Sequence, residues 1–413
     1  MRIVQRFFLL AYVAISVMPL GAQETAGPAD DLSLQGIDLC LPFGSRSTWS
    51  VLPHFVLEGI KYSYANERES GLDFDWASLI FEGNVDQRFF FRAEPDLVGV
   101  DTPRNLYEAW LAWELDPALK LTIGQMRIGL GSELATPIED FPLTGYSFTS
   151  YLDGRYDLGL RADGELLEAS LYYDAVAAAG SGFDLEGHLR ENPQFSLRLV
   201  ASPWRESATP FLSGFFAGGA IAYSPDWDDH ILVATPLEST VFVTPDFEGD
   251  AARWIHLEAG WAGGPVRFGG EVIRGEVSSV PLPAGGELDM DQLTAWTAYA
   301  SWVVTGQEIT WKRGAWQHPL ASVPAEEGWQ DAVEVAARYS NADIDRSLFD
   351  AGYTSYDPST QEVRTFSLDV NWYFTQRLRF AAGWVKTLAD HELTTFGGTS
   401  RDSSFVLRAE LAF

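Results

Sequence analysis

The last twelve residues, 402–413, read DSSFVLRAELAF and decide the fold. Every second side chain near the end of this stretch is apolar, and polar side chains stand between several of them. The apolar series is Phe405, Leu407, Ala409, Leu411 and Phe413, and the residues between include Ser404, Arg408 and Glu410. A helix would place Phe405 and Leu407 about 200° apart, on different faces. A period of two therefore predicts a β-strand with one apolar and one polar face.

The same alternation appears further up the chain, for example in FSLDVNW at 366–372 and YEAWLAWEL at 107–115. Applied to the whole chain, the pattern predicts sixteen strands. Their ranges are 48–64, 72–82, 87–96, 105–115, 120–128, 155–163, 166–174, 194–201, 209–223, 252–262, 265–277, 292–304, 329–340, 361–373, 377–388 and 402–413.

The connections between these strands fall into a short and a long class. Short ones are 83–86, 116–119, 163–165, 202–206, 262–264 and 374–376, and long ones include 129–154, 175–193, 224–251, 278–291, 341–360 and 389–401. A seventeenth strand at 307–312 would break the alternation, so we assign 305–328 to one long turn on the short side. An even number of strands with this loop asymmetry is typical of bacterial outer-membrane barrels. The predicted fold is an all-β, 16-stranded antiparallel transmembrane β-barrel with short periplasmic turns and long extracellular loops; a secreted β-sandwich or β-helix is the alternative.

The start of the chain has the features of an export signal. Arg2 and Arg6 precede an apolar run at 7–20, and Gly21 and Ala22 supply small residues for cleavage. We therefore expect a signal peptide at 1–22, an irregular N-terminal segment at 23–47 and the barrel at 48–413, located in the bacterial outer membrane. Fourteen apolar residues are too few for a membrane-spanning helix, which needs roughly 20.

Composition excludes several classes of protein. With 28 Lys and Arg against 58 Asp and Glu, the net charge is −30, so no basic face is available for a nucleic acid. The single cysteine, Cys40, permits neither an internal disulfide nor a CxxC metal site. The six histidines are scattered, without an HExxH motif, and no GxSxG motif occurs. We predict no cofactor, no metal site and no catalytic residues.

The polar faces of the predicted strands carry charges of both signs. Sixteen strands enclose a lumen too wide for side chains to fill, so such faces predict a water-filled pore. The candidate channel-lining residues are Arg88, Arg92, Glu108, Glu114, Arg155, Arg161, Arg198 and Arg338. For each arginine, bracing the barrel wall is an alternative to a role in selectivity.

Several stretches resemble the phosphate-selective porin O and P family. They are LKLTIGQMR at 119–127, GPVRFGGEVIRGEV at 264–277, SWVVTGQ at 301–307, AVEVAARYS at 332–340 and NWYF at 371–374. The resemblance runs over roughly 70–413. It implies a 16-stranded, usually trimeric porin with inward-folded loops and a preference for phosphate or other anions.

The third long loop differs in charge from what that family's anion preference requires. By analogy with porins, loop 129–154 should form the constriction, yet it carries Glu133, Glu139 and Asp140 and no lysine or arginine. An anion filter needs a ring of Arg or Lys. We therefore expect a porin for passive diffusion of small hydrophilic solutes, with a modest preference for anions such as phosphate set by the arginines of the wall. A cation-preferring porin is the first alternative, and a barrel enzyme or a structural barrel of the envelope are the others.

The same reading predicts the partners. They are outer-membrane lipid and lipopolysaccharide, two further copies in a homotrimer, the solutes themselves, and the barrel-assembly machinery, which would recognise the terminal Phe413.

Overall fold

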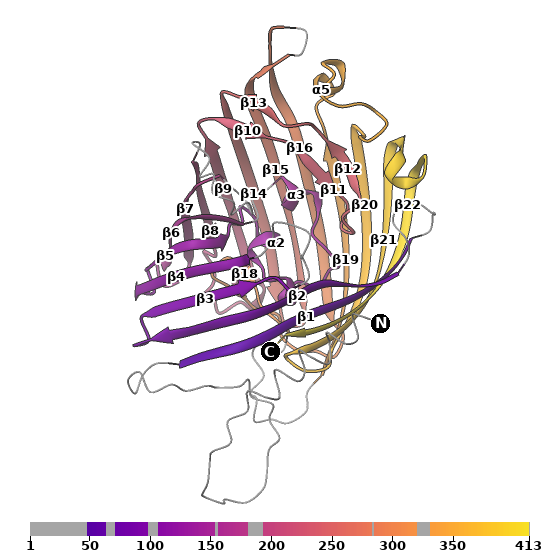
Figure 1. Cartoon of the computed structure of the whole chain (residues 1–413). Coiled ribbons are helices and arrows are strands. Elements are labelled where there is room, and N and C mark those ends of the chain that lie inside the picture. The colour runs from indigo at the N-terminus through magenta and orange to yellow at the C-terminus, as the bar shows by residue number, and fades with distance from the viewer. Residues whose placement is uncertain are drawn as a thin grey trace, which may run out of the picture. The chain divides into compact units, whose positions relative to one another are not determined.

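The computed structural model describes residues 48–62, 71–97, 106–152, 156–180, 193–282, 285–319 and 331–412. Sixteen antiparallel strands follow one another around a closed barrel, and the last pairs with the first (Figure 1). They are β1 (Thr48–Tyr62), β2 (Gly71–Val85), β3 (Phe89–Pro95), β4 (Leu106–Asp116), β5 (Leu119–Arg127), β6 (Tyr156–Leu166), β7 (Leu171–Ala178), β8 (Gln194–Ala201), β9 (Phe215–Ser224), β14 (Ala251–Gly263), β15 (Val266–Pro281), β16 (Glu287–Val303), β19 (Ala332–Asp343), β20 (Glu362–Tyr373), β21 (Leu378–Leu393) and β22 (Thr399–Ala412). The predicted barrel and its strand number are confirmed. The expected signal peptide, the segment 23–47 and Phe413 lie outside the described residues.

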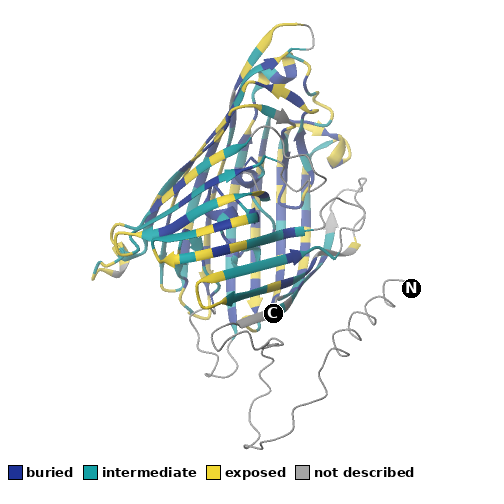
Figure 2. Ribbon diagram, turned by 60° about the vertical axis from the view of Figure 1, so that its left-hand side comes forward, coloured by how far each residue is buried: buried dark blue, intermediate teal, exposed yellow. Residues whose placement is uncertain are grey.

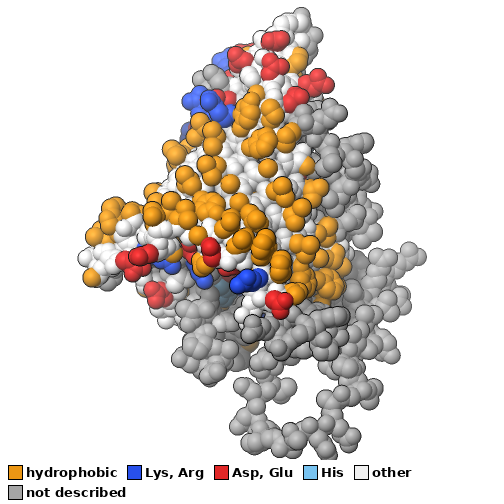
Figure 3. Space-filling view, turned by 90° about the vertical axis from the view of Figure 1, so that its left-hand side faces the viewer, with side chains coloured by type: hydrophobic (Ala, Val, Ile, Leu, Met, Phe, Trp, Pro, Cys, Tyr) orange, Lys and Arg blue, Asp and Glu red, His pale blue; other side chains and the backbone are white. Residues whose placement is uncertain are grey.

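Burial alternates along the strands as the sequence pattern predicts (Figure 2). In β20 each second residue is buried, and the residues between them are exposed and largely apolar. Phe405 and Leu407 of β22 are 58% and 68% exposed. Figure 3 shows a broad apolar area on the outer face, with charged side chains gathered above and below it. An apolar outside with a polar inside is the arrangement that a barrel in lipid requires.

Several connections differ from the prediction: the predicted long loops 278–291 and 389–401 are largely strand, because β15, β16, β21 and β22 extend into them, and two short turns are displaced along the chain. The turn after β6 lies at 167–170 and not at 163–165, and Leu167, Glu168 and Ala169 adopt positive φ. Gly164, inside the predicted turn, is a strand residue whose lack of a side chain lets Ala118 of the turn between β4 and β5 approach. A Cβ at Gly164 would lie 2.1 Å from the Ala118 carbonyl oxygen. Arg88, predicted to line the wall, lies in the turn between β2 and β3 and is exposed.

A further correction concerns the predicted strand 209–223. Its beginning forms a short helix, α4 (Pro210–Ser213), before β9 starts. Proline favours the first turn of a helix because its fixed φ suits that position and no amide hydrogen is needed there.

Further small elements lie in the connections. The long loop between β9 and β14 contains two hairpins, β10 (Trp227–Asp229) with β13 (Phe247–Gly249) and β11 (Leu232–Ala234) with β12 (Thr240–Val243). The long turn after β16, expected to be free of strands, contains the hairpin of β17 (Trp311–Lys312) and β18 (Ala315–Trp316). No helix in the described part of the chain is long and apolar enough to cross a membrane.

Candidate channel lumen

The loop between β5 and β6 lies inside the barrel. Its described part, 128–152, contains α2 (Ser132–Ala135), the 3₁₀ turn η1 (Ile138–Asp140) and α3 (Phe148–Tyr151), and most of these residues are buried. We call this segment the constriction loop. Its helices pack against β15, β16 and β19 of the wall, and against β11 of the β11–β12 hairpin and β18 of the β17–β18 hairpin.

Buried charges attach the constriction loop to the wall. Glu133 of α2 accepts a hydrogen bond from Arg338 of β19 at 2.6 Å and one from the backbone amide of Ser147, also at 2.6 Å. Glu271 of β15 accepts bonds from the Ser132 hydroxyl and from the Glu133 amide. Burial and the charge of Glu271 raise the pKa of Glu133, and Arg338 opposes this shift. Because the pair is completely buried, losing either partner would leave the other charge without compensation.

A second attachment holds the middle of the constriction loop. Arg379 of β21 donates to the carbonyl oxygens of Phe141 at 2.7 Å and Ile138 at 3.3 Å, and it forms an ion pair with Glu410 of β22. Glu410 also bonds to His54 of β1, with 3.2 Å between Oε1 and Nε2. These contacts hold segment 138–141 against the part of the wall where β1 pairs with β22.

The β17–β18 hairpin enters the barrel from the opposite, short-turn end. Trp316 has 0% exposure, and its indole donates to the Tyr299 hydroxyl at 2.6 Å. The indole of Trp311 stacks on Phe216, with ring centroids 3.7 Å apart. The amide of Trp316 donates to the Thr136 hydroxyl of the constriction loop at 3.1 Å. The two inward segments thus meet inside the barrel and fill the space beside β8, β9 and β16.

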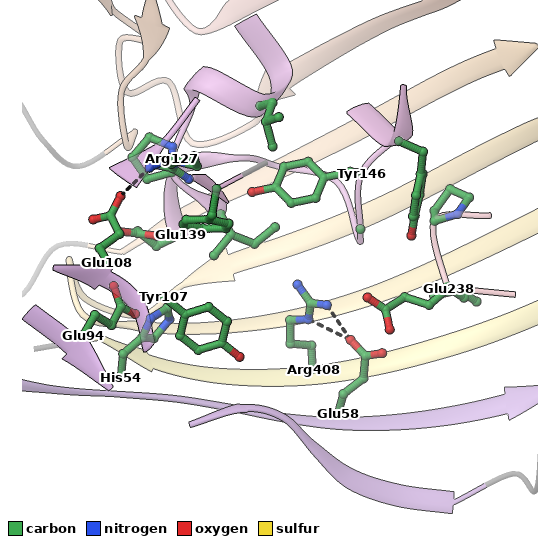
Figure 4. A pocket seen from close by; sticks show the side chains of 18 of the residues that line it. His54, Glu58, Glu94, Tyr107, Glu108, Arg127, Glu139, Tyr146, Glu238 and Arg408 are labelled. Carbon is green, nitrogen blue, oxygen red and sulfur yellow. Dashed lines mark hydrogen bonds and ion pairs between the residues drawn. The ribbon is translucent and has the colours of Figure 1, made fainter. Parts of the chain in front are cut away.

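Two cavities lie on the other side of the constriction loop. The outer cavity, lined by Glu238 of the long loop after β9, holds about 250 Å³ (Figure 4). The inner cavity, lined by Arg377 of the short turn after β20, holds about 210 Å³. Glu139 lines both, so η1 stands between them. The charged residues of the outer cavity are Arg92, Arg127, Arg408, Glu58, Glu94, Glu108, Glu139 and Glu238, together with His54. Those of the inner cavity are Arg377, Arg379, Glu139, Asp140, Glu410 and His318.

Of the predicted lining residues, Arg92, Glu108 and Glu139 line the outer cavity and Asp140 lines the inner one. The others lie elsewhere: Arg161 pairs with Asp174, Arg198 with Glu258, and Arg338 with Glu133, while Glu114 lines neither cavity. Arg155 falls outside the described residues. Arg161 and Arg198 therefore brace the barrel wall, and Arg338 braces the constriction loop.

The wall arginines of the outer cavity are paired as well. Arg92 lies 2.7 Å from Glu94 and 2.9 Å from Glu108, and Arg408 lies 2.6 Å from Glu58. Residues that the sequence reasoning did not select include Glu58, Arg127 and Arg379. The sequence did contain a signal for Glu58. His54 and Glu58 are four residues apart in a predicted strand, so their side chains lie on the same face and form a polar pair there.

Two groups of the inner cavity have shifted pKa values. Burial, aided by Glu139, raises the pKa of Asp140 to about 7, although Arg267 and Arg379 act in the opposite direction. Burial and the nearby Arg379 lower the pKa of His318 to about 4. Asp140 therefore changes its charge near neutral pH, whereas His318 stays neutral there. Within the described residues, no group of His, Cys, Asp and Glu could hold a metal ion.

Several solved structures share this fold. The anion-selective porin from Comamonas acidovorans matches with a TM-score of 0.55 and 11% identity, covering 89% of this chain and 100% of that one. OmpT of Vibrio cholerae matches with a TM-score of 0.53 and 10% identity, covering 92% of this chain and 100% of that one. The outer-membrane channel DcaP of Acinetobacter baumannii matches with a TM-score of 0.53 and 10% identity, covering 89% of this chain and 98% of that one. No curated protein matches by sequence.

The closed barrel with an inward loop is the fold of outer-membrane porins, and together with the family match given next it supports a porin channel. Residues 241–413 match the family model of the phosphate-selective porins O and P, which confirms the resemblance for the stretches at 264–277, 301–307, 332–340 and 371–374; the stretch at 119–127 lies outside the match.

Proposed function

We propose that small hydrophilic solutes diffuse passively along the two cavities, between the constriction loop and the wall formed by β1, β3, β4, β21 and β22. The observation that supports this path is the placement of Glu139, which lines both cavities. Arg92, Glu108, Glu139 and Asp140 would then contact the passing solute.

We further propose that the selectivity among small ions is weak. Arg92 and Arg408 are neutralised by neighbouring glutamates, so they offer no ring of free positive charge for a tight phosphate site. The family match and the anion-selective Comamonas porin favour anions. The outer cavity favours the second candidate, cations, because three arginines and five glutamates give it a net charge of −2 when His54 is neutral.

Reversal potentials across a planar bilayer in a KCl gradient test this proposal. We expect a permeability ratio of chloride to potassium within about fivefold of unity, which corresponds to about 1 kcal/mol. Arg127→Gln should shift the ratio toward potassium and Glu139→Gln toward chloride, because each removes one charge from the outer cavity. A ratio far above unity that neither substitution changes would contradict this proposal.

The same measurement at pH 6 and pH 8 reports on Asp140. Below its pKa of about 7 this carboxyl is protonated and neutral, and above it the carboxylate adds one negative charge to the inner cavity. Lowering the pH from 8 to 6 should therefore shift the ratio toward chloride. Asp140→Asn should remove most of this dependence, whereas a dependence that persists in full would assign it to other groups.

Export and assembly are part of the same proposal. The signal peptide at 1–22, insertion through the terminal Phe413 and a homotrimer all remain proposals; a trimer form of Vibrio cholerae OmpT has been solved, and it shares this fold at 9% identity and a TM-score of 0.53, covering 89% of this chain and 100% of that one. Crosslinking of isolated outer membranes should yield a band of three copies that begin at Gln23. Deleting Phe413 should deplete the protein from that membrane. Normal levels of the truncated protein, or monomers only, would contradict the respective step.

A further inference from the structure

Two side chains of opposite charge in the outer cavity, Arg127 and Glu139, form no ion pair with a described residue. The one hydrogen bond of the Arg127 side chain within the described ranges is long, 3.4 Å from Nη1 to the Thr136 carbonyl oxygen. The Glu139 carboxylate has none there, whereas its backbone carbonyl accepts from Arg379 at 3.4 Å. Both groups therefore keep the capacity to bind a solute, unlike Arg92 and Arg408.

The fold brings these two groups to one place from different elements. Arg127 is the last residue of β5, and Glu139 belongs to η1 of the constriction loop. Figure 4 shows both at the same end of the outer cavity, and Glu139 attracts Arg127 electrostatically. A carboxylate can accept two parallel hydrogen bonds from a guanidinium, and an ammonium group can donate to a carboxylate. A molecule with one group of each kind satisfies both residues at once.

Aromatic rings and the volume of the outer cavity also suit a small solute. Tyr107 and Tyr156 pack with ring centroids 6.1 Å apart, and Tyr146 and Tyr151 also line the cavity. Such rings present apolar surface together with faces that attract cations. A volume of about 250 Å³ accommodates roughly eight waters, or a small solute of similar bulk.

We infer that the outer cavity is a weak binding site for small zwitterions, meaning free amino acids and similar molecules with one carboxylate and one ammonium group. This assignment rests on the proposed channel function. Arg127 holds the carboxylate and Glu139 the ammonium group. A simple anion at Arg127 would meet the nearby Glu108 and Glu139 unfavourably, whereas a zwitterion has no net charge for the cavity's glutamates to repel.

Current block in planar bilayers tests the site with four probes of similar size: 4-aminobutyrate, butyrate, butylammonium and erythritol. For the full-length channel in KCl, 4-aminobutyrate should reduce the current saturably and at the lowest concentration of the four. Arg127→Gln and Glu139→Gln should each raise the half-blocking concentration about tenfold, because each removes one charge-assisted hydrogen bond. Glu114→Gln, which removes a carboxylate outside both cavities, is the matched control and should leave block unchanged.

Three outcomes would overturn the assignment in a channel that conducts. These are the absence of saturable block by 4-aminobutyrate, equal block by erythritol, and stronger block by butylammonium that only Glu139→Gln relieves. Absence of any ion conductance in the wild-type protein would instead contradict the proposed channel function.

Discussion

Replacing residues 308–317 by a Gly/Ser segment of equal length is expected to raise the single-channel conductance severalfold. The hairpin of β17 and β18 occupies barrel space through two tryptophans, Trp311 on Phe216 and Trp316 against Tyr299. Truncating one large buried aromatic residue typically costs about 3–5 kcal/mol. A segment without the two tryptophans therefore loses most of the packing that holds it inside the barrel. Once the hairpin leaves, water and ions can use the space beside β8, β9 and β16.

The control for this replacement is Lys312→Ser. Lys312 lies on the same hairpin but is exposed, so its loss removes a charge without removing an anchor. Its conductance should equal that of the wild type. If the Gly/Ser variant reaches the outer membrane as a heat-stable barrel and still conducts like the wild type, the hairpin does not narrow the channel.

Glu133→Ala is expected to release the constriction loop and to destabilise the barrel. The substitution leaves Arg338 buried without its carboxylate, which typically costs about 3–5 kcal/mol. It also removes the acceptor for the Ser147 amide, so α2 and the residues before α3 lose their common attachment. We expect a lower melting temperature, larger conductance and noisy current from a mobile loop.

Two further variants separate the charge from the packing. Glu133→Leu combined with Arg338→Met removes both charges and keeps the volume, so it should recover much of the stability lost in the single variant. Asp350→Ala breaks an exposed pair with Arg346 and should change the melting temperature very little. An unchanged melting temperature and quiet current in Glu133→Ala would show that the loop is held by other contacts.

The limits of prediction from sequence are visible in particular residues. The alternation around Phe366, Leu368 and Val370 identifies a strand and its lipid-facing side, because a period of two depends on local geometry alone. The predicted turn at 163–165 contains Gly164, and a glycine serves a turn and a close backbone approach equally well, so the residue type alone does not separate the two. Arg161 and Arg198 were predicted to line the channel, but each pairs with a carboxylate on another strand whose register the pattern does not reveal.

The amino-acid sequence by itself determined the barrel and its strand number, because both follow from the alternation of side chains that are neighbours in the chain. Only the tertiary structure decided which charges remain available to a solute. Glu133 and Arg338 are separated by 205 residues and meet because the barrel closes and the loop folds inward. Arg127 and Glu139, twelve residues apart in the chain, remain available to a solute because neither forms an ion pair with a described residue.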